Sequence, residues 1–383
     1  MSNVLDLYDQ SYVSFERAAG VTCVLQCVWV YNRTIDIDGL RRFHHHLRLG
    51  RLSRRIERSP LPFGRHRWVA PNDQSDLEVV EALRPREAFD AWLSEQANKV
   101  LDAEHGPGWH LAMLPFTDGG AGVSLVISHC LTDGVGLCEA LTEAACGYDN
   151  PINWPAAESR RRWQALCEDT RQFAGDIPGI GRAVVAAAQF ARSHRGRAES
   201  ATPAPSAPPA PTARADERVA LSTATVFLDA DEWDARAHSL GGTSNSLLAG
   251  LAARLAQRVG RITADGWATP SIPVNERTAD DTRANAITNV DITADPAVAA
   301  TDLSDIRAAT KRALIRHRDV PDQRWALLPL VPLLPQRLVR RMIGVATGGT
   351  TNVVSSNLGA AAPAVNRPDG TNADHFAMKS LYP

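Results

Sequence analysis

Hydrophobic and polar positions follow two different periods along the chain, and these periods predict strands and helices in both halves. Runs rich in β-branched and aromatic residues predict strands, whereas apolar residues three or four apart after a capping residue predict helices. The first half has predicted strands at 21–31, 67–70, 109–115 and 122–128 and predicted helices at 38–47, 85–100 and 135–145. The second half has predicted strands at 223–229, 267–274, 287–293 and 351–356 and predicted helices at 231–240, 244–259 and 303–316.

One segment divides this pattern into two parts of similar length. Residues 194–217 are rich in alanine, proline and serine and have no periodic apolar face, so we predict an extended linker. The linker separates residues 1–193 from residues 218–383, and each part mixes strands with helices. We therefore predict an α/β protein with two layered halves, which suits a chain of 383 residues.

Composition narrows the classes of protein that fit this pattern. Lys plus Arg is 41 and Asp plus Glu is 43, a balance that argues against a nucleic-acid partner. The first residues lack the basic and apolar regions of a secretory signal, and no uninterrupted apolar stretch is long enough for a membrane span. The six cysteines are sparse, so we expect reduced thiols in a cytoplasmic protein.

The sharpest local feature is a histidine at the end of an apolar strand. The run Val123-Ser-Leu-Val-Ile-Ser leads into His129, and Asp133 and Gly134 follow across a tight turn. A neutral imidazole can take a proton from a hydroxyl near pH 7. Gly134 permits a close approach of another backbone. On spacing alone, a catalytic histidine and a histidine of the core or turn are both compatible with this pattern.

His129-x-x-x-Asp133-Gly134 resembles the His-His-x-x-x-Asp-Gly motif of the superfamily of CoA-dependent acyltransferases and condensation domains. Five further segments resemble the bacterial wax ester synthase/diacylglycerol acyltransferase family of that superfamily, in the family's own order. They are Leu5-Asp-Leu-Tyr-Asp-Gln-Ser-Tyr-Val, residues 54–69, Thr243-Ser-Asn-Ser-Leu-Leu-Ala-Gly-Leu, Ile272-Pro-Val-Asn-Glu-Arg-Thr and Ser355-Ser-Asn-Leu-Gly.

The resemblance implies a fold and an activity. It implies two chloramphenicol-acetyltransferase-like halves, each a mixed sheet with flanking helices, and an active-site tunnel between them. The implied reaction transfers a long-chain acyl group from acyl-CoA or an acyl carrier protein to a fatty alcohol, a diacylglycerol or another lipid-like alcohol. The acyl thioester is then a substrate, and no metal, prosthetic group or other cofactor is implied.

The resemblance also implies roles for individual residues. His129 occupies the position of the general base, which takes the proton of the acceptor alcohol. Asp133 occupies the position of a structural carboxylate, and Arg277 is the expected partner in its ion pair. Asn245 is expected to donate a hydrogen bond in the acyl channel. Asn357 is expected where the second half crosses toward the tunnel.

Three departures from the family pattern keep a second interpretation open. Ser128 replaces the first histidine of the motif, Ser246 replaces the aspartate of the family's Asn-Asp pair, and Leu358-Gly359 replaces Val-Pro-Gly. The alternative is a catalytically inactive member of the same fold that binds an acyl chain or docks a protein. Condensation with an amine is a third possibility, which the lack of a neighbouring carrier or adenylation segment weakens.

Other features of the sequence compete less well for a function. A metal site at His44-His45-His46 is a minority interpretation, because consecutive helical residues face different directions. Cys130 as a nucleophile is another, because it follows a buried strand and is expected to point away from His129. Residues 324–343 are rich in Arg and Leu and fit either peripheral contact with a membrane or lipid droplet, or a buried helix pair broken by prolines. Compared with the family, residues 218–383 are expected to lack the last strands, either because the sequence is incomplete relative to its relatives or because a second chain supplies them.

Overall fold

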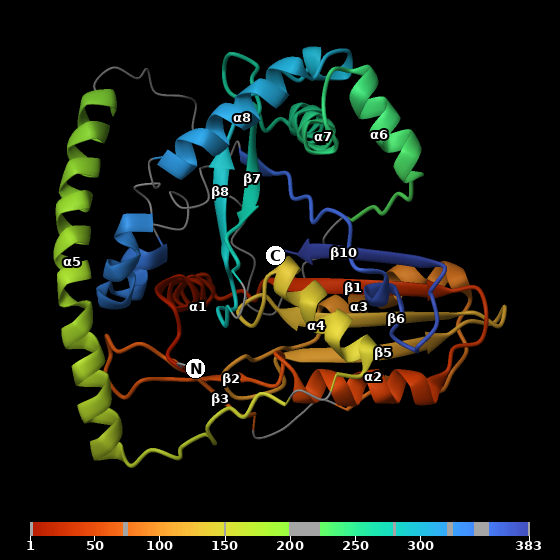
Figure 1. Cartoon of the computed structure of the whole chain (residues 1–383), viewed down its shortest axis with the longest axis horizontal. Helices are drawn as coiled ribbons and strands as arrows, with labels where there is room; N and C mark the ends of the chain where they lie inside the picture. The colour runs from red at the N-terminus through yellow and green to blue at the C-terminus, as the bar shows by residue number, and fades with distance from the viewer. Residues whose placement is uncertain are drawn as a thin grey trace.

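The structure is a computed structural model, and it is mixed α/β in both halves, as the sequence pattern predicts (Figure 1). The residues that it describes are 3–71, 76–148, 151–198, 223–278, 281–319, 325–340 and 352–381. The elements up to the middle of the chain are α1 (Leu7–Ala19), β1 (Val24–Tyr31), α2 (Ile37–Leu49), β2 (Arg55–Glu57), β3 (Arg67–Val69), β4 (Glu78–Val79), η1 (Arg86–Ala88), α3 (Phe89–Ala97), β5 (Trp109–Pro115), β6 (Ala121–Ser128), α4 (Gly134–Cys146) and α5 (Arg162–Ala198).

The remaining elements are shorter and are arranged around a second sheet. They are α6 (Ala230–Ser239), α7 (Ser244–Arg258), β7 (Thr269–Asn275), β8 (Ile287–Asp291), η2 (Val298–Ala300), α8 (Ser304–Asp319), η3 (Trp325–Leu333), β9 (Asn352–Val354), η4 (Pro363–Asn366) and β10 (His375–Leu381).

A five-stranded mixed sheet forms the centre of the first half, with the strand order β10-β1-β6-β5-β4. Its strands pair antiparallel except β4, which is parallel to β5. Alternate residues of a strand point to opposite faces, so Trp29 of β1 packs in the core with Phe43 of α2 and Leu137 of α4. Val28 belongs to the cluster on the other face, with Trp92 of α3. Helices therefore cover both faces of the sheet.

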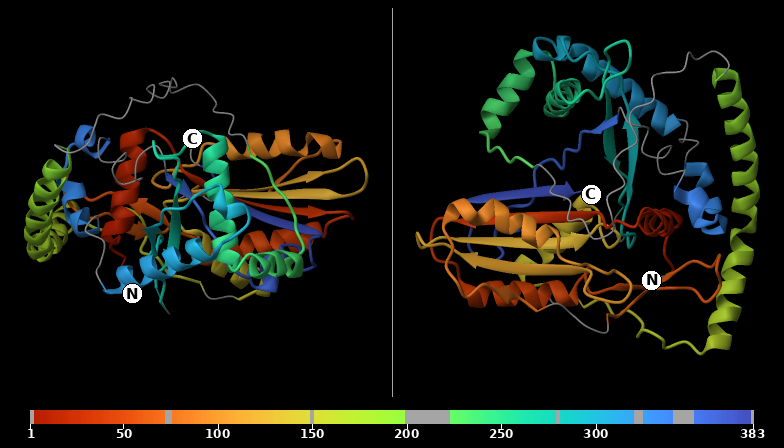
Figure 2. Two further views of the ribbon diagram at one scale, coloured as in Figure 1. Left: turned by 90° about the horizontal axis from the view of Figure 1, so that it is seen from above. Right: turned by 180° about the vertical axis from the view of Figure 1, so that it is seen from behind.

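The second half is built on a three-stranded sheet with the order β8-β7-β9. β7 pairs antiparallel with β8 and parallel with β9. Small residues of α7, among them Ala249 and Ala253, pack in one cluster with Ile292 and with Leu303 at the start of α8. The β7–β8 hairpin extends from these helices to the edge of the first half, close to α1 (Figure 2).

The last strand returns to the first half. β10 pairs with β1 along its length, with Trp29 opposite Phe376, and the two rings lie 5.4 Å apart. The predicted boundary at the linker assigns this strand to the second half, whereas its hydrogen bonds lie in the sheet of the first. The two halves are thus connected by sheet pairing as well as by the chain between them.

Several segments differ from the sequence-based expectations. Residues 223–229 form no strand, and Val226, Phe227 and Leu228 are exposed, so the apolar run there is not part of a sheet. The helix α5 continues to Ala198 and so includes the start of the predicted linker, whose residues 199–217 lie outside the described part of the chain. Within 324–343, the described residues 325–340 contain η3, which packs between α5 and α1 (Figure 1).

Among the described residues, no helix combines the length and the apolar character needed to cross a membrane.

Candidate active site

His129 lies immediately after β6, at the point where the first sheet meets the second half. Its backbone N–H donates to the carbonyl of Cys23 at 2.9 Å, which continues the pairing of β1 with β6 by one step. The ring of Tyr12 from α1 stacks on the imidazole, with centroids 5.1 Å apart. Only 5% of His129 is exposed. The strand end and the stacked ring therefore hold the imidazole in a fixed place.

Asn285, just before β8, contacts His129 from the other half of the molecule. The imidazole Nδ1 lies 2.9 Å from the amide Oδ1 of Asn285. The amide Nδ2 of Asn285 donates to the backbone carbonyl of His129 at 3.0 Å. Asn285 is completely buried. The sequence did not point to Asn285, because 156 positions separate it from His129 and no local pattern marks it.

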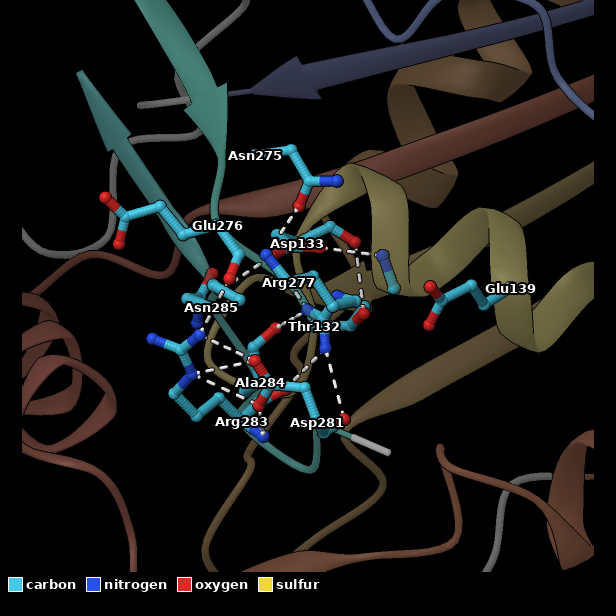
Figure 3. A network of polar contacts seen from close by, with 12 residues as sticks. Thr132, Asp133, Glu139, Asn275, Glu276, Arg277, Asp281, Arg283, Ala284 and Asn285 are labelled. Carbon is cyan, nitrogen blue, oxygen red and sulfur yellow. Dashed lines mark hydrogen bonds and ion pairs between the residues drawn. The ribbon is translucent and has the colours of Figure 1, made fainter. Parts of the chain in front are cut away.

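Asp133 joins the loop after β6 to the segment before β8 (Figure 3). Its Oδ1 accepts from the backbone N–H of Gly136 at 2.7 Å, which caps α4. Its Oδ2 accepts from Arg277 Nη2 and from the backbone N–H of Ala286, both at 2.8 Å. The structure thus brings Asp133 and Arg277 together, 144 positions apart in the sequence.

Arg277 follows β7, and its guanidinium is enclosed by main-chain oxygens as well as by Asp133. Nη1 donates to the carbonyl of Arg283, and Nη2 donates to that of Ala284, each at 3.0 Å. The side chains of Arg277 and Asp133 are 3% and 1% exposed. A Cβ at Gly136 would lie 2.9 Å from Arg277 Nη2, so the second glycine after Asp133 makes room for the guanidinium.

A second buried arginine supports the same loop. Arg54 Nη2 donates to the carbonyl of Leu131 and Nη1 to that of Thr282, both at 2.8 Å. Its guanidinium lies over the ring of Trp68, 4.1 Å from the centroid. Burial lowers the pKa of Arg54 to about 9. Arg54 therefore links the loop after β6 to the segment after β7.

Burial sets the charge of the imidazole. Desolvation lowers the pKa of His129, although hydrogen bonds to its own backbone and to Asn285 and the charge of Asp133 oppose this. The imidazole is therefore neutral near pH 7 and has one nitrogen able to accept a proton. A neutral histidine fixed at a strand end, with a buried ion pair beneath its loop, can act as a general base.

Asn245 and Asn357 lie together on the side of the second half. Asn357 Nδ2 donates to Asn245 Oδ1 at 2.6 Å. The next residue, Leu358, packs against the motif, because a Cβ at Gly134 would lie 2.9 Å from its Cδ2. Asn245 also lines a pocket of about 260 Å³ between α7 and α8, with Arg307 and Lys311. The segment around Asn357 thus connects this pocket with the start of α4.

The two serines that depart from the family pattern have local structural roles. Ser246 forms a capping box with Thr243 at the start of α7, and its Oγ accepts from the Thr243 N–H at 2.6 Å. Ser128 is fully buried, and its Oγ accepts from the backbone N–H of Cys130 at 3.2 Å. Both hydroxyls satisfy backbone donors at a turn.

Cys130 does not have the surroundings of a nucleophile. Its Sγ donates to Glu16 Oε2 at 3.0 Å, and burial raises the pKa of the thiol well above its usual value. The thiolate, which is the reactive form, is therefore scarce at neutral pH. Burial also raises the pKa of Glu16, to about 7. The thiol of Cys130 is therefore paired with Glu16 and is not poised to react.

Of three comparisons with known proteins, the comparison with solved structures identifies a fold. No protein-family model matches the sequence, and no curated protein matches it. Polyketide synthase associated protein 5 from Mycobacterium tuberculosis is a similar solved structure, with a TM-score of 0.54 and 16% identity over 99% of this chain and 86% of that one.

Two condensation domains are similar to the same extent. The first condensation domain of the CDA synthetase has a TM-score of 0.54 and 12% identity, over 99% of this chain and 84% of that one. The condensation domain of the monacolin K polyketide synthase has a TM-score of 0.51 and 12% identity, over 99% and 86%. The chain therefore has the condensation-domain fold, which is the chloramphenicol-acetyltransferase-like architecture expected from the sequence.

Proposed function

We propose that the protein is an acyltransferase that moves an acyl group from a thioester to a hydroxyl group, with His129 as general base. The observation that carries the proposal is a neutral, buried histidine at the end of β6, held between the two halves of a condensation-domain fold. The ion pair of Asp133 and Arg277 fixes the loop that bears it.

The chemistry needs one base and no covalent intermediate on the protein. His129 takes the proton of the acceptor hydroxyl while its oxygen attacks the thioester carbonyl. The tetrahedral intermediate collapses with cleavage of the carbon–sulfur bond, and the thiolate takes the proton from the imidazolium. An ester and a free thiol are the products, so atoms and charges balance. The donor is a thioester of CoA or of a carrier-protein pantetheine, and no other cofactor takes part.

The substrates of this proposal follow from the resemblance of the sequence. A long-chain acyl donor and a lipid-like alcohol, such as a fatty alcohol or a diacylglycerol, are the substrates of the wax ester synthase/diacylglycerol acyltransferase family. The pocket beside Asn245 supports these substrates, because it is lined by both basic and apolar residues, Lys311 and Leu314 among them. Such a lining suits a ligand with an anionic and an apolar part.

A second candidate function is a non-catalytic member of the fold that binds an acyl chain. It is favoured by one observation, that Ser128 stands where the motif has its first histidine and is fully buried. This candidate predicts binding of acyl-CoA without release of free CoA, and indifference of that binding to replacement of His129.

Release of free thiol from long-chain acyl-CoA, measured against a panel of alcohols, tests the proposal. The wild type is expected to release CoA only with an acceptor alcohol present, and His129→Ala is expected to lower kcat by at least about 1000-fold, because the base is removed. His105→Ala is the matched control, since His105 is exposed and forms its ion pair with the neighbouring Asp102. Equal turnover of the wild type and His129→Ala would refute the role of His129 as base.

A further inference from the structure

A buried carboxylate on α1 reaches the segment that contacts His129. Asp9 is 1% exposed. Its Oδ2 accepts from the backbone N–H of Ala284 at 2.9 Å, and its Oδ1 accepts from that of Asn285, also at 2.9 Å. The same Oδ1 lies 3.4 Å from the side-chain Nδ2 of Asn285. Asp9 therefore holds both the backbone and the amide of Asn285.

These contacts fix which way the amide of Asn285 points. Its Nδ2 faces two oxygens that can only accept, the backbone carbonyl of His129 and the carboxylate of Asp9. The opposite orientation would place the amide oxygen against both acceptors. The amide Oδ1 must therefore face the imidazole Nδ1, at 2.9 Å. An amide oxygen has lone pairs and no proton to donate.

The tautomer of the imidazole follows from this. Because Oδ1 of Asn285 only accepts, the hydrogen bond exists when Nδ1 of His129 carries the proton. In the neutral imidazole the other nitrogen, Nε2, then has the lone pair. A buried amide, oriented by a buried carboxylate, thus acts together with the hydrogen bond to the histidine's own backbone to select the nitrogen that can accept a proton.

We propose that Asn285, oriented by Asp9, is a positioning residue that keeps His129 in the Nδ1–H tautomer, with Nε2 as the basic nitrogen. The tautomer of the ring follows from the geometry, and only its effect on the reaction rests on the proposed acyltransferase function. Neither residue touches the reacting atoms in this proposal. Their effect on the reaction passes through the imidazole.

The surroundings of the two residues are compatible with this role near neutral pH. Burial raises the pKa of Asp9 to about 6, against the lowering effects of the backbone N–H groups and of Arg54. Asp9 is therefore mainly ionised above pH 7 and accepts from both backbone donors. Among the charged or titratable groups near His129, in the part of the chain that the structure describes, are Asp133 from its own loop and Tyr12 from α1, whose ring stacks on it.

Heteronuclear NMR of protein labelled with ¹⁵N-histidine tests the tautomer without any substrate. At pH 8 the ring of His129, assigned by its loss in His129→Ala, is expected to show a protonated Nδ1 and an unprotonated Nε2. In Asn285→Ala the amide acceptor is absent and only the hydrogen bond to the histidine's own backbone is left, so a larger population with protonated Nε2 is expected. Asn98→Ala is the matched control, because Asn98 is an exposed amide that caps α3. A wild-type ring with protonated Nε2 overturns the proposal, whether or not Asn285→Ala folds.

Kinetics separate this proposal from the proposed function. If the wild type releases CoA, Asn285→Ala is expected to lower kcat by about 100-fold or more, with KM for the acyl donor within a factor of about 2. An unchanged kcat in folded Asn285→Ala refutes the positioning role. If the wild type releases no CoA but shows protonated Nδ1, the acyltransferase proposal fails and the assignment of the tautomer stands.

Discussion

Replacement of Asp133 by asparagine removes one negative charge and leaves the shape of the side chain nearly unchanged. In the wild type, one carboxylate oxygen accepts from the Gly136 N–H, and the other accepts from Arg277 and from the Ala286 N–H. An asparagine has one oxygen and one NH₂ group at these two places. Whichever way the amide turns, its NH₂ group faces a buried donor. An asparagine at position 133 therefore cannot accept all of the hydrogen bonds that the aspartate accepts.

The size of the effect depends on the buried guanidinium. Loss of one member of a buried ion pair costs about 3–5 kcal/mol, and a buried N–H without an acceptor costs about 1–3 kcal/mol. Arg277 keeps its hydrogen bonds to the carbonyls of Arg283 and Ala284, both at 3.0 Å, which favours the lower end of the first range. Asparagine is also as good an N-cap as aspartate. We therefore expect Asp133→Asn to lower the free energy of unfolding by about 3 kcal/mol.

Equilibrium unfolding in urea, followed by tryptophan fluorescence, measures this difference. Asp38→Asn is the matched control, because Asp38 forms a 2.8 Å ion pair with Arg41 on the surface of α2, where both side chains are largely exposed. Exposed pairs of this kind contribute about 0–1 kcal/mol. If Asp133→Asn and Asp38→Asn lower the free energy of unfolding equally, the buried pair does not stabilise the site as we argue.

Two further predictions concern the walls of the site. Gly136→Ala is expected to lower the free energy of unfolding by about 1–3 kcal/mol, because its Cβ would lie 2.9 Å from Arg277 Nη2. Gly175→Ala on α5, where a Cβ meets no atom within 4 Å, is expected to leave the free energy of unfolding unchanged in the same urea assay. Equal losses of stability in the two variants would show that the contact with Arg277 is not the cause. Because burial raises the pKa of Glu16 from 4.5 to about 7, the folded protein keeps a proton that the unfolded chain releases, and stability falls by about 3 kcal/mol as pH rises through this range. Glu16→Gln, which can still accept from the Cys23 N–H, is expected to abolish this loss of stability. Urea unfolding of wild type and variant at pH 4.5 and 8 measures the difference. Parallel pH profiles of the two proteins would show that Glu16 keeps an ordinary pKa.

The proposed base and the elements around it were predictable from the sequence because their signals are local. The apolar run before His129 becomes β6, and Asp133 is an N-cap residue directly before α4. A period of two or of 3.6 residues can be detected within one short window. The ion pair with Arg277 was also expected, although only because the segment Ile272-Pro-Val-Asn-Glu-Arg-Thr resembles a known family.

Two of the misplaced or missed elements depend on distant partners, whereas the helices α1 and α5 were also not predicted. The apolar run at 223–229 has the composition of a strand but is not in a sheet of the described residues, and Val226, Phe227 and Leu228 are exposed. β10 was not predicted, and it becomes a strand by pairing with β1, more than 340 positions earlier. Whether such a segment forms a strand is decided by the presence of an edge to pair with, which local propensity does not encode.

By itself, the sequence determined that the chain alternates strands and helices in two halves and that a histidine ends a buried strand. Only the tertiary structure decided what surrounds that histidine. Asn285 and Asp9 lie 156 positions after and 120 positions before His129, and neither carries a local signature. Their contact arises because the β7–β8 segment is packed between α1 and the loop after β6, where each buried donor must find an acceptor. That requirement acts on the folded chain, and so the tautomer of the candidate base is a property of the fold.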